Sequence, residues 1–131
     1  MAQQPIELIL LKQVASELAL PIFLVNPDGD LLYYNEPAEL ILGRRYDETG
    51  ELPLSEWSVL FTPEDEHGEP FAPEHLPLVR VLAERHPVHG GFAITGLDGV
   101  RRMLSVTAVP IVGLGDRFLG AVALFWEEGT A

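Results

Sequence analysis

The sequence predicts an α+β domain with a five-stranded antiparallel sheet, short helices inserted after the second strand and an amphipathic helix before the first. Two short apolar runs bounded by turn residues occur early in the chain, and three more occur near its end. Between these groups the apolar side chains recur at helical spacing. The chain has 131 residues, of which 47% are apolar, so it is long enough for one domain with a sizeable core.

An N-terminal helix is predicted within residues 1–20. Apolar side chains recur there at steps of three and four and form a stripe on one helix face, made of Leu8, Leu11, Ala15 and Leu18. More apolar side chains lie beside or beyond that stripe, at Ile6, Ile9 and Leu10. Because one packing face does not need this much apolar surface, we expect the stripe to join two copies of the chain. A helix that only covers its own domain is the alternative.

The segment 21–43 predicts a strand, a tight turn, a second strand and a capped helix. The strands are expected at residues 22–26 and 31–34, with a Pro-Asp-Gly turn between them. Asn35 is a good N-cap for the following helix, and Gly43 can end that helix in the left-handed conformation. This order of elements opens the domain.

The middle of the chain predicts short helices. Residues 44–68 are irregular, with helical turns expected at 55–61. Residues 73–85 predict one longer helix whose first turn tolerates Pro77. The inward stripe of this helix is expected at Leu78, Val79 and Leu82.

Three strands are expected in the last third of the chain, at residues 91–96, 102–112 and 118–126. The dipeptide Asp98-Gly99 is a strong hairpin signal between the first two. Alternation in the second strand assigns Leu104, Val106 and Ala108 to one face. It assigns Met103, Ser105, Thr107 and Val109 to the other.

The formal net charge of −12 bears on the possible partners of the chain. It argues against nucleic acid and against anionic membrane surfaces, which would repel the protein. A basic protein partner is possible, although high solubility is the simpler interpretation. The chain has no cysteine, which fits a reducing cytoplasm. No signal peptide and no apolar run long enough to span a membrane are recognisable.

Several motifs together resemble a PAS domain over about residues 18–126. The opening hairpin of that family resembles PIFLVNPDGDLLYYN, and its first helix resembles NEPAELILG. The long helix of one bacterial subgroup resembles LPLVRVLAER. The closing hairpins resemble LDGVRRMLSVTAVPI and DRFLGAVALFWE.

The resemblance implies the strand order 2-1-5-4-3 and a small pocket between the curved sheet and the inserted helices. It divides the chain into a dimerisation helix at 1–20, a PAS domain at 21–127 and a tail at 128–131. An Asp-Ile-Thr-like exit, frequent in the family, does not follow Trp126. The chain is therefore expected to be either a stand-alone PAS protein or a sensor module separated from its output domain.

A ligand pocket is the expected functional site. Its predicted apolar lining is Trp57, Phe61, Val79, Leu82, Ile94 and Met103, and Ser105 or Thr107 would supply polar contacts. A core in which these side chains fill the space themselves is the alternative. A shift of one residue in register would exchange Met103 with Leu104.

No cofactor is identified by the sequence. Without cysteine, the covalent photochemistry of the flavin-binding and coumaryl-binding branches is excluded, whereas a non-covalently bound flavin stays an open alternative that no motif supports. Haem-binding members use a histidine on or near the long helix, and the candidates here are His75, His86 and His89. We expect these to be surface or capping residues, and we expect no metal site at the pair His86 and His89. The glycines Gly113, Gly115 and Gly120 fit a hairpin loop and a tightly packed strand better than a nucleotide-binding loop.

The sequence as a whole predicts a non-catalytic sensory or interaction module. It is expected to be a cytoplasmic homodimer that binds a small ligand or a signalling protein. A dimerisation module with a filled core and no ligand is the first alternative. A small α+β enzyme is the second, and it would need a buried acid or histidine with a shifted pKa in the pocket.

Overall fold

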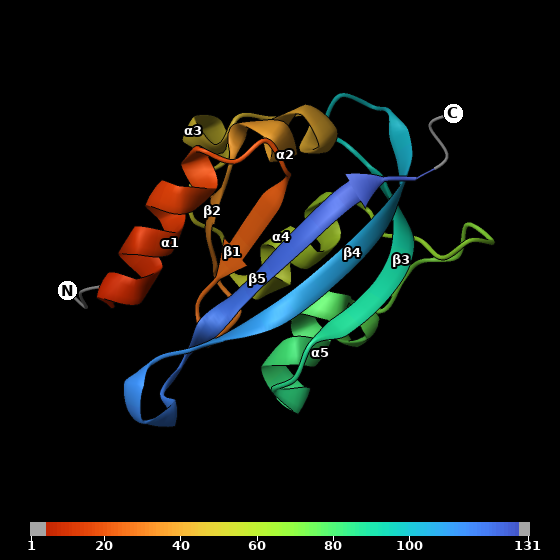
Figure 1. Cartoon of the computed structure of the whole chain (residues 1–131). Helices are drawn as coiled ribbons and strands as arrows, with labels where there is room; N and C mark the ends of the chain where they lie inside the picture. The colour runs from red at the N-terminus through yellow and green to blue at the C-terminus, as the bar shows by residue number, and fades with distance from the viewer. Residues whose placement is uncertain (1–4, 129–131) are drawn as a thin grey trace.

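A five-stranded antiparallel sheet forms the centre of the protein, with the strand order β2-β1-β5-β4-β3 (Figure 1). The computed structural model describes residues 5–128. Its elements in chain order are α1 (Ile6–Ser16), β1 (Ile22–Val25), β2 (Leu31–Tyr34), α2 (Glu36–Leu42), α3 (Tyr46–Thr49), α4 (Leu54–Leu60), the 3₁₀ helix η1 (Pro73–His75), α5 (Pro77–Glu84), β3 (Val88–Thr95), β4 (Arg101–Val112), the 3₁₀ helix η2 (Leu114–Asp116) and β5 (Phe118–Glu127). The predicted fold class and strand order are confirmed.

The two ends of the chain lie outside the described residues. Residues 1–4 of the predicted N-terminal segment and residues 129–131 of the predicted tail belong to these ends. Of the described helices, none is long and apolar enough to cross a membrane.

The sheet separates two apolar clusters of unequal size. The face that packs against α4 and α5, here called the inner face, carries the larger cluster, which includes Phe23, Trp57 and Phe125. The opposite, outer face carries a smaller cluster under α1, which includes Leu8, Leu24 and Val122. In Figure 1, α1 lies on the side of the sheet away from α4 and α5. Strand β1 contributes side chains to both clusters because successive residues of a strand point to opposite faces.

The structure corrects the predicted role of the apolar stripe on α1. Leu8 is 1% exposed and Ala15 is 0% exposed, because both side chains pack on the outer face of their own sheet. Leu11 is half-buried against the same cluster, and Leu18, beyond the end of α1, is 41% exposed. The large apolar side chains of α1 that remain exposed are those beside the stripe, Ile6, Ile9, Leu10 and Val14.

Asn35 caps α2 as predicted and also ties this helix to α1 and β1. Its Oδ1 accepts hydrogen bonds from the backbone N–H groups of Ile22 at 3.0 Å and Ala38 at 3.3 Å. Its Nδ2 donates to the carbonyl oxygens of Ala15 and Leu20, both at 2.9 Å. The side chain is fully buried, so its four hydrogen bonds satisfy polar groups that have no access to water. One buried amide therefore joins the N-terminal helix to the domain.

The helix predicted at 73–85 is in fact two helices. It is interrupted at Leu76, whose backbone is extended, with φ −65° and ψ 134°. The cause is Pro77, because the ring of a proline disfavours the helical conformation in the preceding residue. Pro77 thus begins α5 rather than lying inside a longer helix. Leu78 and Val81 are the buried apolar side chains of α5, whereas Val79 and Leu82 are half-buried at the edge of the inner cluster.

Glycine is needed where β5 passes closest to β1. Gly120 has φ 138°, and a Cβ at this position would collide with the carbonyl oxygen of Val25 on β1. A larger residue would force the two strands apart. The prediction of a tightly packed strand glycine at this position is confirmed.

Candidate functional site

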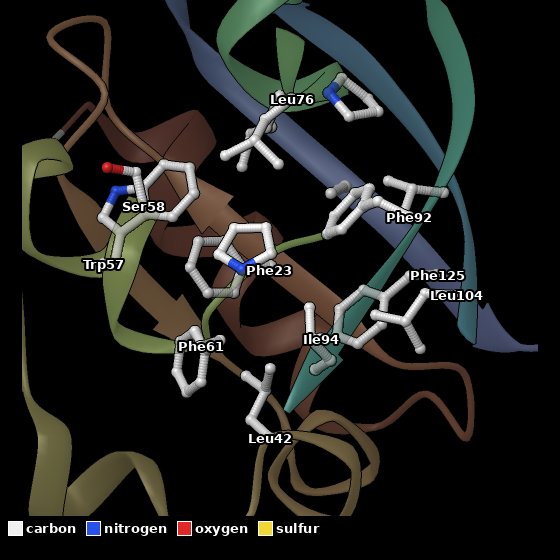
Figure 2. A pocket seen from close by; sticks show the side chains of 15 residues that line it. Phe23, Leu42, Trp57, Ser58, Phe61, Leu76, Phe92, Ile94, Leu104 and Phe125 are labelled. Carbon is white, nitrogen blue, oxygen red and sulfur yellow. The ribbon is translucent and has the colours of Figure 1, made fainter. Parts of the chain in front are cut away.

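A cavity of about 70 Å³ lies between the inner face of the sheet and the helices that cover it (Figure 2). The sheet contributes Phe23, Phe92, Ile94, Leu104, Val106, Ala123 and Phe125 to its lining. The helices and their connections contribute Leu42, Trp57, Ser58, Phe61, Pro63, Leu76, Pro77 and Leu78. These residues come from separate segments spread between residues 23 and 125, so the cavity exists only in the folded domain.

Aromatic packing holds one wall of the cavity in place. The Trp57 Nε1–H donates to the carbonyl oxygen of Gly29 at 2.7 Å, which fastens α4 to the turn between β1 and β2. The Trp57 ring meets the Phe23 ring edge to face, with 5.1 Å between centroids. On its other side Phe23 stacks on Tyr34, with centroids 5.9 Å apart. These rings fill the space beside the cavity, and they limit how far its wall can collapse inward.

The structure brings together three of the predicted lining residues. Trp57, Phe61 and Ile94 all line the cavity and come from two separate parts of the chain. Val79 and Leu82 do not line it and lie half-buried at the border of the inner cluster. Leu78 lines the cavity in place of Val79, the lining residue that we expected.

Met103, Ser105 and Thr107 lie on the outer face of the sheet, so the prediction that they line the cavity is wrong. The alternation that we assigned to β4 is correct, but the side that faces inward is the opposite one. Leu104 pairs with Phe92 of β3, and both side chains line the cavity. Because side chains alternate along a strand, Met103 and Ser105 must then point away from it.

Several lining residues were not predicted from the sequence. Phe23 and Phe125 lie on strands that are apolar on both faces, so alternation carries no signal about which side chains point inward. Phe92 lies in a segment for which we predicted a strand, and its pairing with Leu104 decides its direction. The sequence pattern did not show which residue of β4 pairs with Phe92, and that pairing is what decides the direction of its side chain.

The lining contains no charged side chain. The nearest guanidinium on the inner side of β4 is that of Arg102, opposite Ile94. It donates to the carbonyl oxygen of Ile41 at 2.9 Å, and it pairs with Asp98 at 3.1 Å and Glu127 at 3.4 Å. The hydrogen bond from Arg102 holds the pKa of Asp98 below its usual range. Arg102 is thus fully engaged in fastening the sheet to α2 and the β3–β4 turn.

The three histidines considered for a haem or metal are all exposed and do not line the cavity. The His89 Nδ1 lies 2.7 Å from the Thr107 hydroxyl on the outer face, and the His86 Nε2 lies 3.2 Å from a Glu84 carboxylate oxygen. Among residues 5–128, no three His, Cys, Asp or Glu side chains come together as a metal site.

The sequence matches the family model for the PAS fold over residues 10–126. The chain therefore belongs to the PAS family. PAS domains commonly act as sensory and signalling modules and are generally not catalytic.

Solved PAS structures share this fold. The PAS domain of Bordetella pertussis BvgS is 17% identical, with a TM-score of 0.70, and the match covers 96% of this chain and 89% of that one. The LOV protein of Rhodobacter sphaeroides is 12% identical, with a TM-score of 0.74 and coverage of 95% and 69%. The light-state dimer of the fungal blue-light photoreceptor Vivid is 10% identical, with a TM-score of 0.67 and 97% coverage of both chains.

At these identities the similarity shows the fold alone. No curated protein matches the chain in sequence. The chemistry of the site must therefore be argued from the residues of this chain.

Proposed function

We propose that the chain is a non-catalytic sensory PAS module whose cavity holds a small ligand and whose occupancy alters a contact with a protein partner. The observation that carries this proposal is the apolar cavity between α4, α5 and the inner face of the sheet. Hollows lined mainly by aromatic and aliphatic side chains are the usual form of small-molecule sites. The lining offers no acid or histidine that could act as a general acid or base, which supports a non-catalytic role.

Strand β1 supplies a physical route from the cavity to α1. Phe23 lines the cavity, while its neighbours Ile22 and Leu24 belong to the outer cluster under α1. A ligand that displaces the Phe23 ring would shift the backbone to which Leu8 and Ala15 are packed. Binding would then favour one position of α1 over another, provided that the ligand has different affinities for the two states.

We propose that α1 contacts a second copy of the chain through its exposed apolar side chains rather than through the buried stripe. Ile6 is 66% exposed, Ile9 48%, Leu10 53% and Val14 54%. These four side chains are uncharged although the chain has a net charge of −12, so a second copy could approach there with the least repulsion. Vivid is described as a dimer in its light state, which is consistent with this proposal but concerns another protein.

Native mass spectrometry of freshly purified protein tests the ligand proposal. We expect extra mass on the folded chain that disappears when the same sample is denatured. A bare polypeptide mass in the native spectrum, from several growth conditions, would contradict a resident ligand. The same spectra report whether one chain or two are present.

The double variant Ile9→Glu/Leu10→Glu tests the dimer contact by analytical ultracentrifugation. Because both side chains point away from the sheet, we expect the variant to stay folded and to sediment as a monomer where the parent sediments as a dimer. Leu40→Glu is the matched control, since Leu40 is 73% exposed on α2. Equal masses for the parent and the double variant would rule out this contact.

A pure interaction module without a ligand is the second candidate function. The small size of the cavity favours it, because aromatic rings already occupy most of the space around Phe23. In that case the exposed face of α1 would be the functional surface. For either function we propose a cytoplasmic location, which the absence of cysteine supports.

A further inference from the structure

We infer that the cavity accepts an uncharged, apolar molecule no larger than one aromatic ring, and that it rejects carboxylates, phosphates and flavins. This inference rests on the proposed function and specifies the chemical class of the ligand. Its basis is the complete absence of charge from the lining and the near absence of free polar atoms.

Only two lining side chains carry a polar atom, Trp57 and Ser58. The Trp57 indole N–H is already used, since it donates to the carbonyl oxygen of Gly29 at 2.7 Å. A single hydroxyl thus remains for the whole cavity. A flavin ring has several nitrogen and oxygen atoms along its edges, and most of them would be buried without a partner.

An anionic ligand would find no cation. Arg102 lies on the inner side of β4, but its side chain is 16% exposed and its guanidinium is paired with Asp98 and Glu127. It also donates to the carbonyl oxygen of Ile41 at 2.9 Å. An incoming carboxylate would have to compete with these two carboxylates, and an unpaired charge in an apolar cavity is strongly disfavoured.

The surroundings favour a dry cavity. One water needs about 10–15 Å³ and two to four polar partners, and the cavity offers about 70 Å³ but hardly any partner. A larger apolar cavity, of about 150 Å³, stays free of water and takes up benzene. Five aromatic rings face the space, from Phe23, Trp57, Phe61, Phe92 and Phe125 (Figure 2). Their faces and edges suit a small ring or a short aliphatic chain.

A hollow on the surface suggests where such a ligand enters. It lies between α4 and the segment 62–71, and it shares Ser58 and Pro63 with the cavity. Glu64 is the charged residue on its rim, with a carboxylate oxygen 3.1 Å from Arg101.

Isothermal titration calorimetry with toluene and with benzoate tests the inference. The two probes share a ring and differ by the negative charge. We expect toluene to bind and benzoate and flavin mononucleotide to bind at least about 100-fold more weakly, because burial without a partner penalises their charges.

Two alanine variants locate the binding site. Ala123 and Ala108 are paired on neighbouring strands and belong to the inner cluster, but only Ala123 lines the cavity. We expect Ala123→Val to weaken the binding of toluene at least about 10-fold. Ala108→Val should leave the affinity for toluene within about 2-fold of the parent. If Ala123→Val does not fold, Val106→Ile is the substitute variant, because Val106 also lines the cavity and the change adds one methylene group to it.

The outcomes separate this inference from the proposed function. Tighter or equal binding of benzoate would overturn the apolar class while leaving a ligand-binding sensor intact. Unchanged toluene affinity in both cavity-filling variants would overturn this cavity as the site. If neither probe binds and native spectra show no bound molecule, both the inference and the ligand-binding function fail, and the interaction module is favoured.

Discussion

The two faces of the sheet are built from similar apolar side chains but are completed differently. On the outer face, Leu8 and Ala15 of α1 pack directly on Leu24 and Val122. On the inner face, the covering helices leave a cavity of about 70 Å³ among aromatic rings. Helix α1 has exposed apolar side chains on its other side, whereas α5 presents Arg80 and Glu84 there, joined by an ion pair of 2.9 Å.

This difference separates two roles. The inner face offers a cavity, and the far side of its covering helix α5 carries an ion pair. On the outer face α1 packs against the sheet, but this covering helix has an apolar side that nothing in the described chain covers. Ligand binding is therefore expected inside the domain and subunit contact outside it, with β1 as the element common to both.

The largest expected effect is at the amide that joins α1 to the domain. Asn35→Ala removes four hydrogen bonds and leaves buried carbonyls and N–H groups unsatisfied, which should lower the free energy of unfolding by about 3–5 kcal/mol. Asn26→Ala is the control, since its side chain accepts two bonds within a turn and should cost about 1 kcal/mol. Urea unfolding measures both. Equal losses would show that α1 is not fastened through Asn35.

The next effect distinguishes the two sides of α1. Leu8→Ala should lower the free energy of unfolding by about 2–5 kcal/mol, because it leaves a void between α1 and the sheet. Leu10→Ala, at a position that is 53% exposed, should change it by no more than about 0.5 kcal/mol in a monomeric sample. Urea unfolding at low protein concentration is the measurement. A small loss at Leu8 would mean that α1 is not held against the sheet.

A smaller effect compares the tryptophans of the two faces. Trp57→Phe leaves the Gly29 carbonyl oxygen without its donor and should cost about 1–3 kcal/mol. Trp126 is 40% exposed on the outer face, and Trp126→Phe should cost less than about 0.5 kcal/mol. Thermal and urea unfolding of the pair would reveal the difference. Comparable costs would argue against a special role of Trp57 in the cavity wall.

The smallest effect concerns the pH dependence of stability. Burial, followed by the nearby Glu51 carboxylate, raises the pKa of Tyr46 from 10.0 to about 12, and burial also raises the pKa values of Tyr33 and Tyr34. The folded state then holds these protons more tightly than the unfolded state. This contribution to stability is complete below pH 10 and is lost as the pH rises from about 10 to 12.

Absorbance at alkaline pH checks this expectation. These are the only three tyrosines of the chain and the pKa of each is raised, so tyrosinate absorbance should appear at a higher pH in the native protein than in the unfolded chain. The same titration in concentrated urea provides the control, with an ordinary transition near pH 10. An ordinary transition in the native protein would contradict the buried position of Tyr34 and the half-buried positions of Tyr33 and Tyr46.

The features that the sequence determined by itself are local ones. The Asn35 cap and the left-handed end at Gly43 were predicted correctly, because each depends on residues within one turn of the helix. Strand positions such as residues 31–34 were also correct, since apolar runs between turn residues identify them. The break at Leu76 is equally local and follows from Pro77, but we underestimated that signal.

Only the tertiary structure decided which faces point inward. Alternation along β4 divides its side chains into two sets, but that pattern does not tell which set faces the cavity. The pairing of Leu104 with Phe92 of β3 decides it. Helix α1 is apolar on both sides, so its sequence favours neither as the packing face. The outer sheet selects the side of Leu8 and Ala15, and it leaves Ile9 and Leu10 exposed. Contacts between distant segments made these choices, because the local pattern fits both faces equally well.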